Sequence, residues 1–216
     1  MESLFALRIC LAAAFIYAVI ALGFMLARTA RLGGQPLFAR PVGLESAGIV
    51  YAFTRGMNPL EKDSSRHHMP TYVAGFLYHI ATFISAILLI LVTWGVSLPP
   101  GVLWFMRILI CGGILSGVAL LVKRMVHAQL RIISTYDDFL SNLLVDVFLA
   151  TSLATTVWAT AEPALLVSAI LVLLYLPVGK IRHCVFYFYA RFAFGRLFGR
   201  RGIFPRPASD SRTGAT

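Results

Sequence analysis

The chain has 216 residues, of which 59% are apolar and 13% charged, and its 19 Lys and Arg residues outnumber 9 Asp and Glu, giving a formal net charge of +10. A soluble domain carries about 25% charged and roughly 45–50% apolar residues. The composition therefore excludes a disordered chain, a secreted disulfide scaffold and an ordinary water-soluble enzyme. Such apolarity and such positive charge are compatible only if they occupy different parts of the chain.

Five apolar segments are long enough to cross a bilayer, because a hydrocarbon core of about 30 Å needs about 20 helical residues. They cover residues 4–27, 72–98, 102–122, 142–161 and 164–183. The first run is too long for the apolar part of a cleavable signal peptide, which has about 7–15 residues. Pro99–Gly101 and Glu162–Pro163 favour tight turns. The pattern predicts an all-α integral membrane bundle of five helices within residues 1–190.

Positive charge is confined to one side of this predicted bundle. Of the 19 Lys and Arg residues, 17 fall in the segment 28–71, in the loop between the third and fourth spans, or from Lys180 at the end of the fifth span onward. The two opposite loops contain none. By the positive-inside rule, the N-terminus faces outward and the C-terminus faces the cytoplasm of a bacterial or archaeal cell. We expect a multi-pass protein of the cytoplasmic (inner) membrane.

The predicted cytoplasmic face contains two further features. Within the segment 28–71, residues Leu44–Phe53 are apolar enough for a short interfacial helix. The tail 191–216 begins with interleaved aromatic and Arg residues and ends in a polar stretch, Pro205–Thr216, which is expected to be disordered. Aromatic residues with arginines suit either a helix at the lipid headgroups or a protein docking surface. Nucleic-acid binding is not expected, because topology alone accounts for the basic residues.

His79 is an ionisable residue inside the second predicted span, which makes it a functional-site hypothesis by default. Its neighbours on the same helix face are Gly75, Thr82 and Ala86. All three are small, so the face leaves room for a flat, bulky group against the backbone. The alternative is a histidine that hydrogen-bonds to a neighbouring helix.

His183 closes the fifth predicted span and lies toward the same side of the membrane as His79. Gly179 precedes it by one turn, and Lys180 and Arg182 lie beside it. Two histidines at one depth on different helices can supply both axial ligands of a haem, and nearby cations can neutralise its propionates. The alternative is that His183 is an interfacial basic residue.

Three other histidines lie outside the predicted spans. His67 and His68 precede the second span, and His127 lies in the basic segment after the third. Each is expected to be a polar surface residue, although one of them could replace His183 as a ligand. The three cysteines are scattered without a metal-binding spacing.

The five-helix plan and two short motifs resemble the gamma subunit of respiratory nitrate reductases and the related membrane subunits of heterodisulfide-reductase-like and sulfite-reductase-associated complexes. The motifs are Leu77–Ile80 in the second span and Leu176–His183 at the end of the fifth. The resemblance covers roughly residues 1–190. It implies that His79 and His183 are the axial ligands of the haem b nearer the cytoplasmic partner.

The sequence departs from the two-haem members of this family. They have a second histidine about ten residues later in the second span and another some eighteen residues before the closing one. Leu89 and Leu165 occupy those places here. We therefore expect one haem, and the family's quinol site beside the distal haem is in doubt.

Asp146 and a glycine pair are the other unusual features of the predicted spans. Asp146 lies about five residues into the fourth span. The sequence favours an ion pair with Lys123 or Arg124 slightly over a role in proton or quinone chemistry, because an unpaired carboxylate is costly there. Gly113 and Gly117 form a GxxxG pattern, which favours close helix packing or, alternatively, clearance for a porphyrin.

The combined hypothesis is a haem b membrane anchor that passes electrons between the quinone pool and a cytoplasmic iron–sulfur or redox subunit. Bis-histidine ligation leaves no open iron position, which favours electron transfer over oxygen chemistry. The chain would be the electron-transfer subunit of a quinone-linked oxidoreductase rather than an enzyme alone. The rival hypothesis is a non-haem scaffold or assembly subunit. A secondary transporter is a weaker third, because the chain lacks internal repeats.

Overall fold

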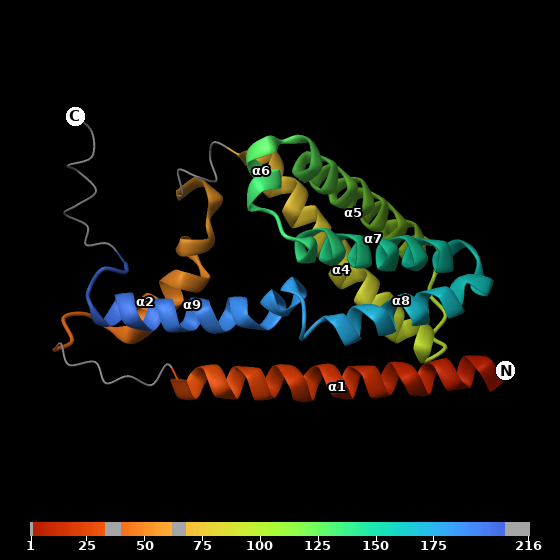
Figure 1. Ribbon diagram of the computed structural model, residues 1–216, viewed down its shortest axis with the longest axis horizontal. Helices are drawn as coiled ribbons and strands as arrows, with labels where there is room; N and C mark the ends of the chain where they lie inside the picture. The colour runs from red at the N-terminus through yellow and green to blue at the C-terminus, as the bar shows by residue number, and fades with distance from the viewer. Residues whose placement is uncertain (1, 33–39, 62–67, 206–216) are drawn as a thin grey trace. The chain divides into compact units, whose positions relative to one another are not determined.

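The computed structural model describes residues 2–32, 40–61 and 68–205 (Figure 1). Every regular element in these ranges is helical, as the apolar pattern predicts. The chain divides into two compact units, one formed by Met1–Leu22 with Pro70–Arg182 and the other by Gly23–Met69 with His183–Thr216. This division differs from the boundary at residue 190 expected from the sequence.

Four helices are long and apolar enough to cross a membrane, namely α1 (Glu2–Leu32), α4 (Met69–Thr93), α5 (Pro100–Val126) and α7 (Tyr136–Val157). They correspond to the first four predicted spans. Large apolar side chains remain exposed along them, with Phe5 and Phe24 of α1 both 68% accessible. Such side chains are suited to contact with lipid rather than water. The architecture is therefore compatible with a multi-pass membrane protein.

The fifth predicted span, 164–183, is not one continuous helix. Helix α8 (Glu162–Tyr175) has 14 residues, which at 1.5 Å per residue is about 21 Å and shorter than a hydrocarbon core. Pro177 follows, and its ring disfavours helical continuation. The chain then forms the 3₁₀ turn η4 (Lys180–Arg182) and α9 (His183–Arg200). A fifth crossing requires α8 and α9 to act together as one broken span.

Local sequence signals explain where several of these helices begin and end. Gly95 has φ +68°, and the N–H groups of Gly95 and Val96 bond to the carbonyls of Val92 and Leu91 at 3.0 and 2.9 Å. This is the glycine-dependent Schellman ending. Pro100 occupies the first turn of α5, where its missing N–H costs nothing.

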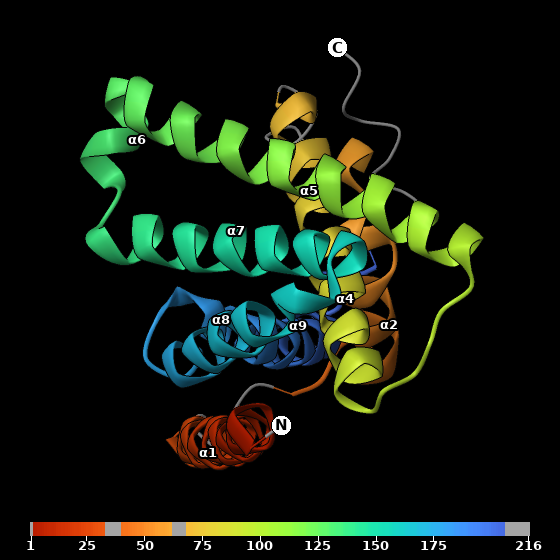
Figure 2. The same cartoon turned by 90° about the vertical axis from the view of Figure 1, so that its right-hand side faces the viewer.

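Helices α4, α5 and α7 surround the first of two apolar cores. Its buried residues are Ala81, Leu88, Met106, Ile110, Val145 and Leu149. Figure 2 shows α5 and α7 joined at one end through the short helix α6 (Ala128–Ile133). A Cβ added at Gly113 of α5 would overlap the Cβ of Ala81. The GxxxG pattern therefore brings two helices into close contact, as one of its two interpretations predicts.

The second core joins α7 to α8 and to the first part of α1. Its buried residues are Leu11, Phe148, Leu165, Leu166 and Ala169. The guanidinium of Arg8 pairs with Glu162 at 2.8 Å beside it. Helix α7 contributes to both cores, so it is the central helix of this unit. The turn η3 (Ala159–Ala161) connects it to α8.

In the second unit, α2 (Glu45–Phe53) packs against α9, and the two lie side by side in Figure 1. Gly48 on α2 meets Gly195 and Gly199 on α9, where an added Cβ would overlap backbone atoms. The carboxylate of Glu45 pairs with Arg196 at 3.1 Å and Arg200 at 3.4 Å. The turns η1 (Arg55–Met57) and η2 (Pro59–Glu61) follow α2. The short helix predicted at Leu44–Phe53 is confirmed, whereas its packing against the aromatic segment was not anticipated.

The glycine contact between α4 and α5 leads to a stability prediction. We expect Gly113→Ala to lower the free energy of unfolding by about 1–3 kcal/mol, because the new methyl group overpacks the contact with Ala81. Gly112→Ala is the matched control, since no atom lies within 4 Å of its added Cβ. Thermal unfolding of both variants in the same detergent tests this expectation. Equal unfolding temperatures would contradict it.

Candidate functional site

His79 lies in α4 with its side chain on an exposed face. Its Nδ1 lies 2.6 Å from the carbonyl oxygen of Gly75, one turn earlier. Because a carbonyl oxygen only accepts, Nδ1 donates, and in the neutral ring Nε2 then has the lone pair. Metal-binding histidines typically have this arrangement, in which the second nitrogen bonds to a carbonyl and fixes the ring orientation.

Gly75, Thr82 and Ala86 all lie in α4, so they share a helix face with His79 as the sequence predicts. An added Cβ at Gly75 would have no atom within 4 Å in the described structure. The hydroxyl of Thr82 donates to the carbonyl of Tyr78 at 2.8 Å, so it turns back to its own helix. Ala86 is half-buried on the same face. The ring of His79 contacts the carbonyl of Gly75 within its own helix.

His183 is the first residue of α9 and its side chain is exposed. It belongs to the second unit, whereas His79 belongs to the first. Of the residues preceding it, Gly179 is buried and an added Cβ there would overlap the ring of Tyr175. Arg182 is exposed in η4.

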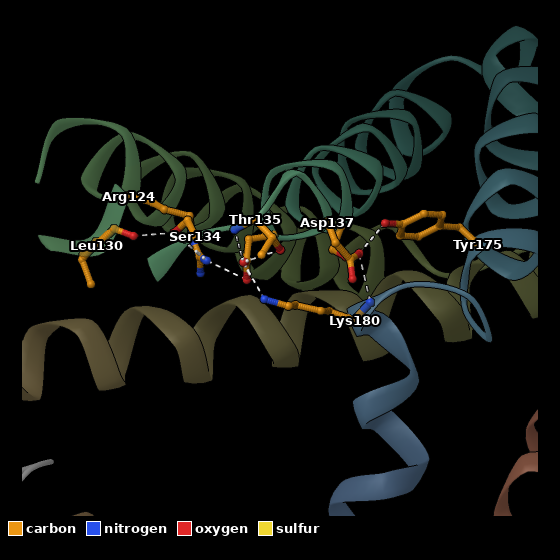
Figure 3. A network of polar contacts seen from close by, with 9 residues as sticks. Arg124, Leu130, Ser134, Thr135, Asp137, Tyr175 and Lys180 are labelled. Carbon is orange, nitrogen blue, oxygen red and sulfur yellow. Dashed lines mark hydrogen bonds and ion pairs between the residues drawn. The ribbon is translucent and has the colours of Figure 1, made fainter. Parts of the chain in front are cut away.

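Lys180 contacts an acidic cluster that the sequence analysis did not single out (Figure 3). Its Nζ lies 2.5 Å from Asp138, which also pairs with Arg124 at 2.7 Å. The carboxylate of Asp138 accepts a bond from the backbone N–H of Thr135 at 2.9 Å and so caps α7. One carboxylate thereby joins the end of α5, the start of α7 and η4.

Asp137 forms the other half of the cluster. Its carboxylate accepts bonds from the Tyr175 hydroxyl and from the backbone N–H of Lys180, the latter at 3.1 Å. Ser141 donates to it from the next turn of α7 at 3.1 Å. Consecutive aspartates after a threonine, near cations at the ends of neighbouring helices, were the available sequence signal for this cluster.

The ion pair predicted for Asp146 is wrong. Lys123 donates instead to the hydroxyl of Thr71 at 2.5 Å, and Arg124 pairs with Asp138. Both cations lie in the last turn of α5. They reach polar partners near the helix ends, so neither is drawn to a carboxylate two turns farther along α7.

Asp146 lies instead in a buried polar cluster with Tyr78 and Asn142. Its side chain is 9% exposed, and its Oδ2 accepts a bond from the Asn142 amide at 2.8 Å. The Tyr78 hydroxyl donates to the carbonyl of Asn142 at 3.1 Å. A Cβ at Gly117 would overlap the Oδ1 of Asp146. Tyr78 and Asn142 were missed, although Asn142 lies one helical turn before Asp146.

The structure also describes two of the three other histidines and both leucines, Leu89 and Leu165. His127 is exposed between α5 and α6, and His68 is exposed before α4, whereas His67 lies outside the described residues. Leu89 and Leu165 both lie in or against the second apolar core, with Leu165 fully buried. Apolar packing therefore occupies both of these positions.

Within the described ranges, no group of three or more His, Cys, Asp or Glu side chains is arranged to hold a metal ion. A haem site with two axial histidines does not require such a group. No protein-family model, curated protein or solved structure matches the chain. A function for the chain therefore has to be inferred from its own residues.

The contacts of Asp138 predict that its negative charge and its capping of α7 contribute separately to the stability of the protein. We expect Asp138→Ala to lower the free energy of unfolding by about 1–3 kcal/mol, because it removes a helix cap and leaves Arg124 and Lys180 without this anion. Asp138→Asn should cost less, since its amide oxygen can still accept the Thr135 bond. Denaturation at low and high salt provides the measurement. Equal losses in the two variants would contradict a contribution from capping, and no loss in Asp138→Asn at low salt would contradict a contribution from charge.

Proposed function

We propose that the chain crosses the membrane five times, with its N-terminus outside and its C-terminus in the cytoplasm. The support is the distribution of positive charge, with 17 of 19 Lys and Arg residues on one side of this arrangement. The fifth crossing would then consist of α8, the turn that follows it and the start of α9, and the Arg-rich remainder of α9 would lie on the cytoplasmic side. Such a break is tolerated in a membrane when its backbone groups are paired within the protein. The Lys180 N–H, which bonds to Asp137, is one such group.

A fluorescent reporter distinguishes five crossings from four. Green fluorescent protein fused after Thr216 is expected to fluoresce, because it matures in the cytoplasm and not after export in unfolded form. The same fusion to a chain truncated after Val157 should be dark, since four crossings place its end outside. A dark full-length fusion that is expressed and membrane-bound would overturn the proposed orientation.

Within this topology, we propose a haem b-binding electron-transfer subunit. The observation that carries the proposal is the 2.6 Å bond from His79 to Gly75, which orients the ring and directs its second nitrogen away from its own helix backbone. His183 is the proposed second axial ligand. Gly75, Thr82 and Ala86 would line the group, and Arg182 would neutralise a propionate. Gly179 is covered by the ring of Tyr175 and Lys180 pairs with Asp138, so neither is included. When bound, a bis-histidine haem supplies reversible one-electron chemistry without an open iron position.

The proposed partners are the quinone pool and a cytoplasmic iron–sulfur or redox subunit. The resemblance to the nitrate reductase gamma subunits supports this role, and the basic, aromatic α9 supports a docking surface on the cytoplasmic side. Four arginines and no acidic residue lie between His183 and Pro205. The chain itself provides ligands, orientation and an apolar environment, whereas substrate chemistry belongs to the partner.

The ligand assignment is tested by replacing single histidines. We expect His79→Ala to lose at least nine-tenths of the haem absorbance while the chain still inserts in the membrane, because one axial ligand is removed. His183→Ala should behave in the same way. His127→Ala is the matched control and should retain the spectrum, since His127 is exposed between two helices. A pyridine haemochrome assay should give one haem per wild-type chain.

Two outcomes would contradict this assignment. An unchanged spectrum in His79→Ala would remove this residue from the ligand set, and two haems per chain would contradict the expected single site. A colourless wild-type protein, purified from cells supplied with haem precursors, would favour the non-haem scaffold instead.

A further inference from the structure

The cluster formed by Tyr78, Asn142 and Asp146 contains the one carboxylate that is buried among the residues that the structure describes. Its carboxylate is nine-tenths buried in the middle of an apolar helix. One oxygen is bonded to Asn142, while Oδ1 has no hydrogen-bond partner among the described residues. Burial of a carboxylate without a cation and with an unsatisfied oxygen is costly.

No positive charge in the described structure compensates for this carboxylate. On the packed face of α5, the nearest chain segment is Gly117, which has no side chain. Lys123 and Arg124 at the end of α5 bond to Thr71 and Asp138. From α4, the group that faces the cluster is the Tyr78 hydroxyl, which is uncharged.

Polar residues connect the cluster to the end of α7. Asp138, Asn142 and Asp146 are spaced by four residues and therefore lie on one face of the helix. Asp138 pairs with Lys180, whose side chain is 48% exposed. Eight residues separate Asp138 from Asp146, which is about 12 Å along a helix. A polar stripe thus extends from an accessible ion-pair network to the buried carboxyl.

We propose that Asp146 is a proton-binding site inside the membrane region, at which the carboxyl group binds and releases one proton in exchange with water at the Asp138 end of α7. The step is the addition of a proton to one carboxylate oxygen and its return to water, with no change in oxidation state. A proton on Oδ1 removes the buried charge and turns an unsatisfied acceptor into a donor. Asn142 holds the other oxygen and orients the group.

This site shares no residue with the proposed haem site, although Tyr78 directly precedes His79 on α4. In a quinone-linked protein it would provide a place for a proton that accompanies an electron. In a scaffold it would still bind a proton. Its test therefore requires neither haem nor quinone.

The experiment uses dicyclohexylcarbodiimide, an apolar reagent that adds to protonated carboxyl groups and rearranges to a stable acylurea. Full-length protein in detergent is treated with the reagent, and the modified peptide is located by mass spectrometry. We expect one adduct at Asp146 and its complete loss in Asp146→Asn, which preserves size and the contact with Asn142. Asp137 and Asp138 are internal controls, since hydrogen bonds and ion pairs stabilise their charged forms.

A second measurement follows the exchange of the Asp146 proton with water, whereas labelling follows the reactivity of its carboxyl group. The carbonyl stretching band of a protonated carboxyl in the infrared spectrum should shift in heavy water, and it should be absent from Asp146→Asn. Preferential labelling of Asp137 or Asp138, or no labelling of Asp146 in folded wild-type protein, would overturn the proposal. A carboxyl band that stays unshifted in heavy water would overturn the exchange with water.

Discussion

Packing of α7 against both α5 and α8 is the interaction on which the first unit depends, and α4 approaches α5 closely at Gly113. In lipid, apolar side chains gain nothing by leaving water, so helices associate through tight packing and polar contacts. The methyl group of Ala81 lies where a Gly113 side chain would otherwise be. One turn farther along α5, Gly117 leaves room for Tyr78 and Asp146. The same glycine spacing therefore creates both an apolar contact and the space for a buried polar cluster.

The sequence predicted those features that depend on neighbouring residues. Four long apolar helices and the helix at Leu44–Phe53 follow from apolar runs, and all are present. The tight turn predicted at Pro99–Gly101 is wrong, because the chain reverses at Gly95 and Pro100 already begins α5. Glu162–Pro163 likewise begins α8 instead of forming the predicted turn. The end of α8 at Tyr175 was missed because the apolar run continues through Pro177, although the proline stops the helix. The packing of α2 on α9 was missed for another reason, since it joins glycines about 150 residues apart.

Polar side chains show the limit of sequence reasoning most clearly. The proposal that Lys123 or Arg124 neutralises Asp146 used distance along the membrane and charge, but it took no account of competing partners. Thr71 and Asp138 satisfy those cations, and the amide of Asn142 reaches Asp146 from one turn away. The sequence placed Gly75 on the same helix face as His79, but it gave no sign of the hydrogen bond between the His79 ring and the Gly75 carbonyl.

The short connection between α4 and α5 has a consequence for how the membrane domain assembles. Only Trp94–Pro99 separate the two helices, and six extended residues reach at most about 20 Å. The glycine ending at Gly95 shortens this reach further because it reverses the chain at once. The two helices therefore stay at high effective concentration from the moment both are synthesised. Their pairing is an intramolecular step, and this hairpin can form before α7 is complete.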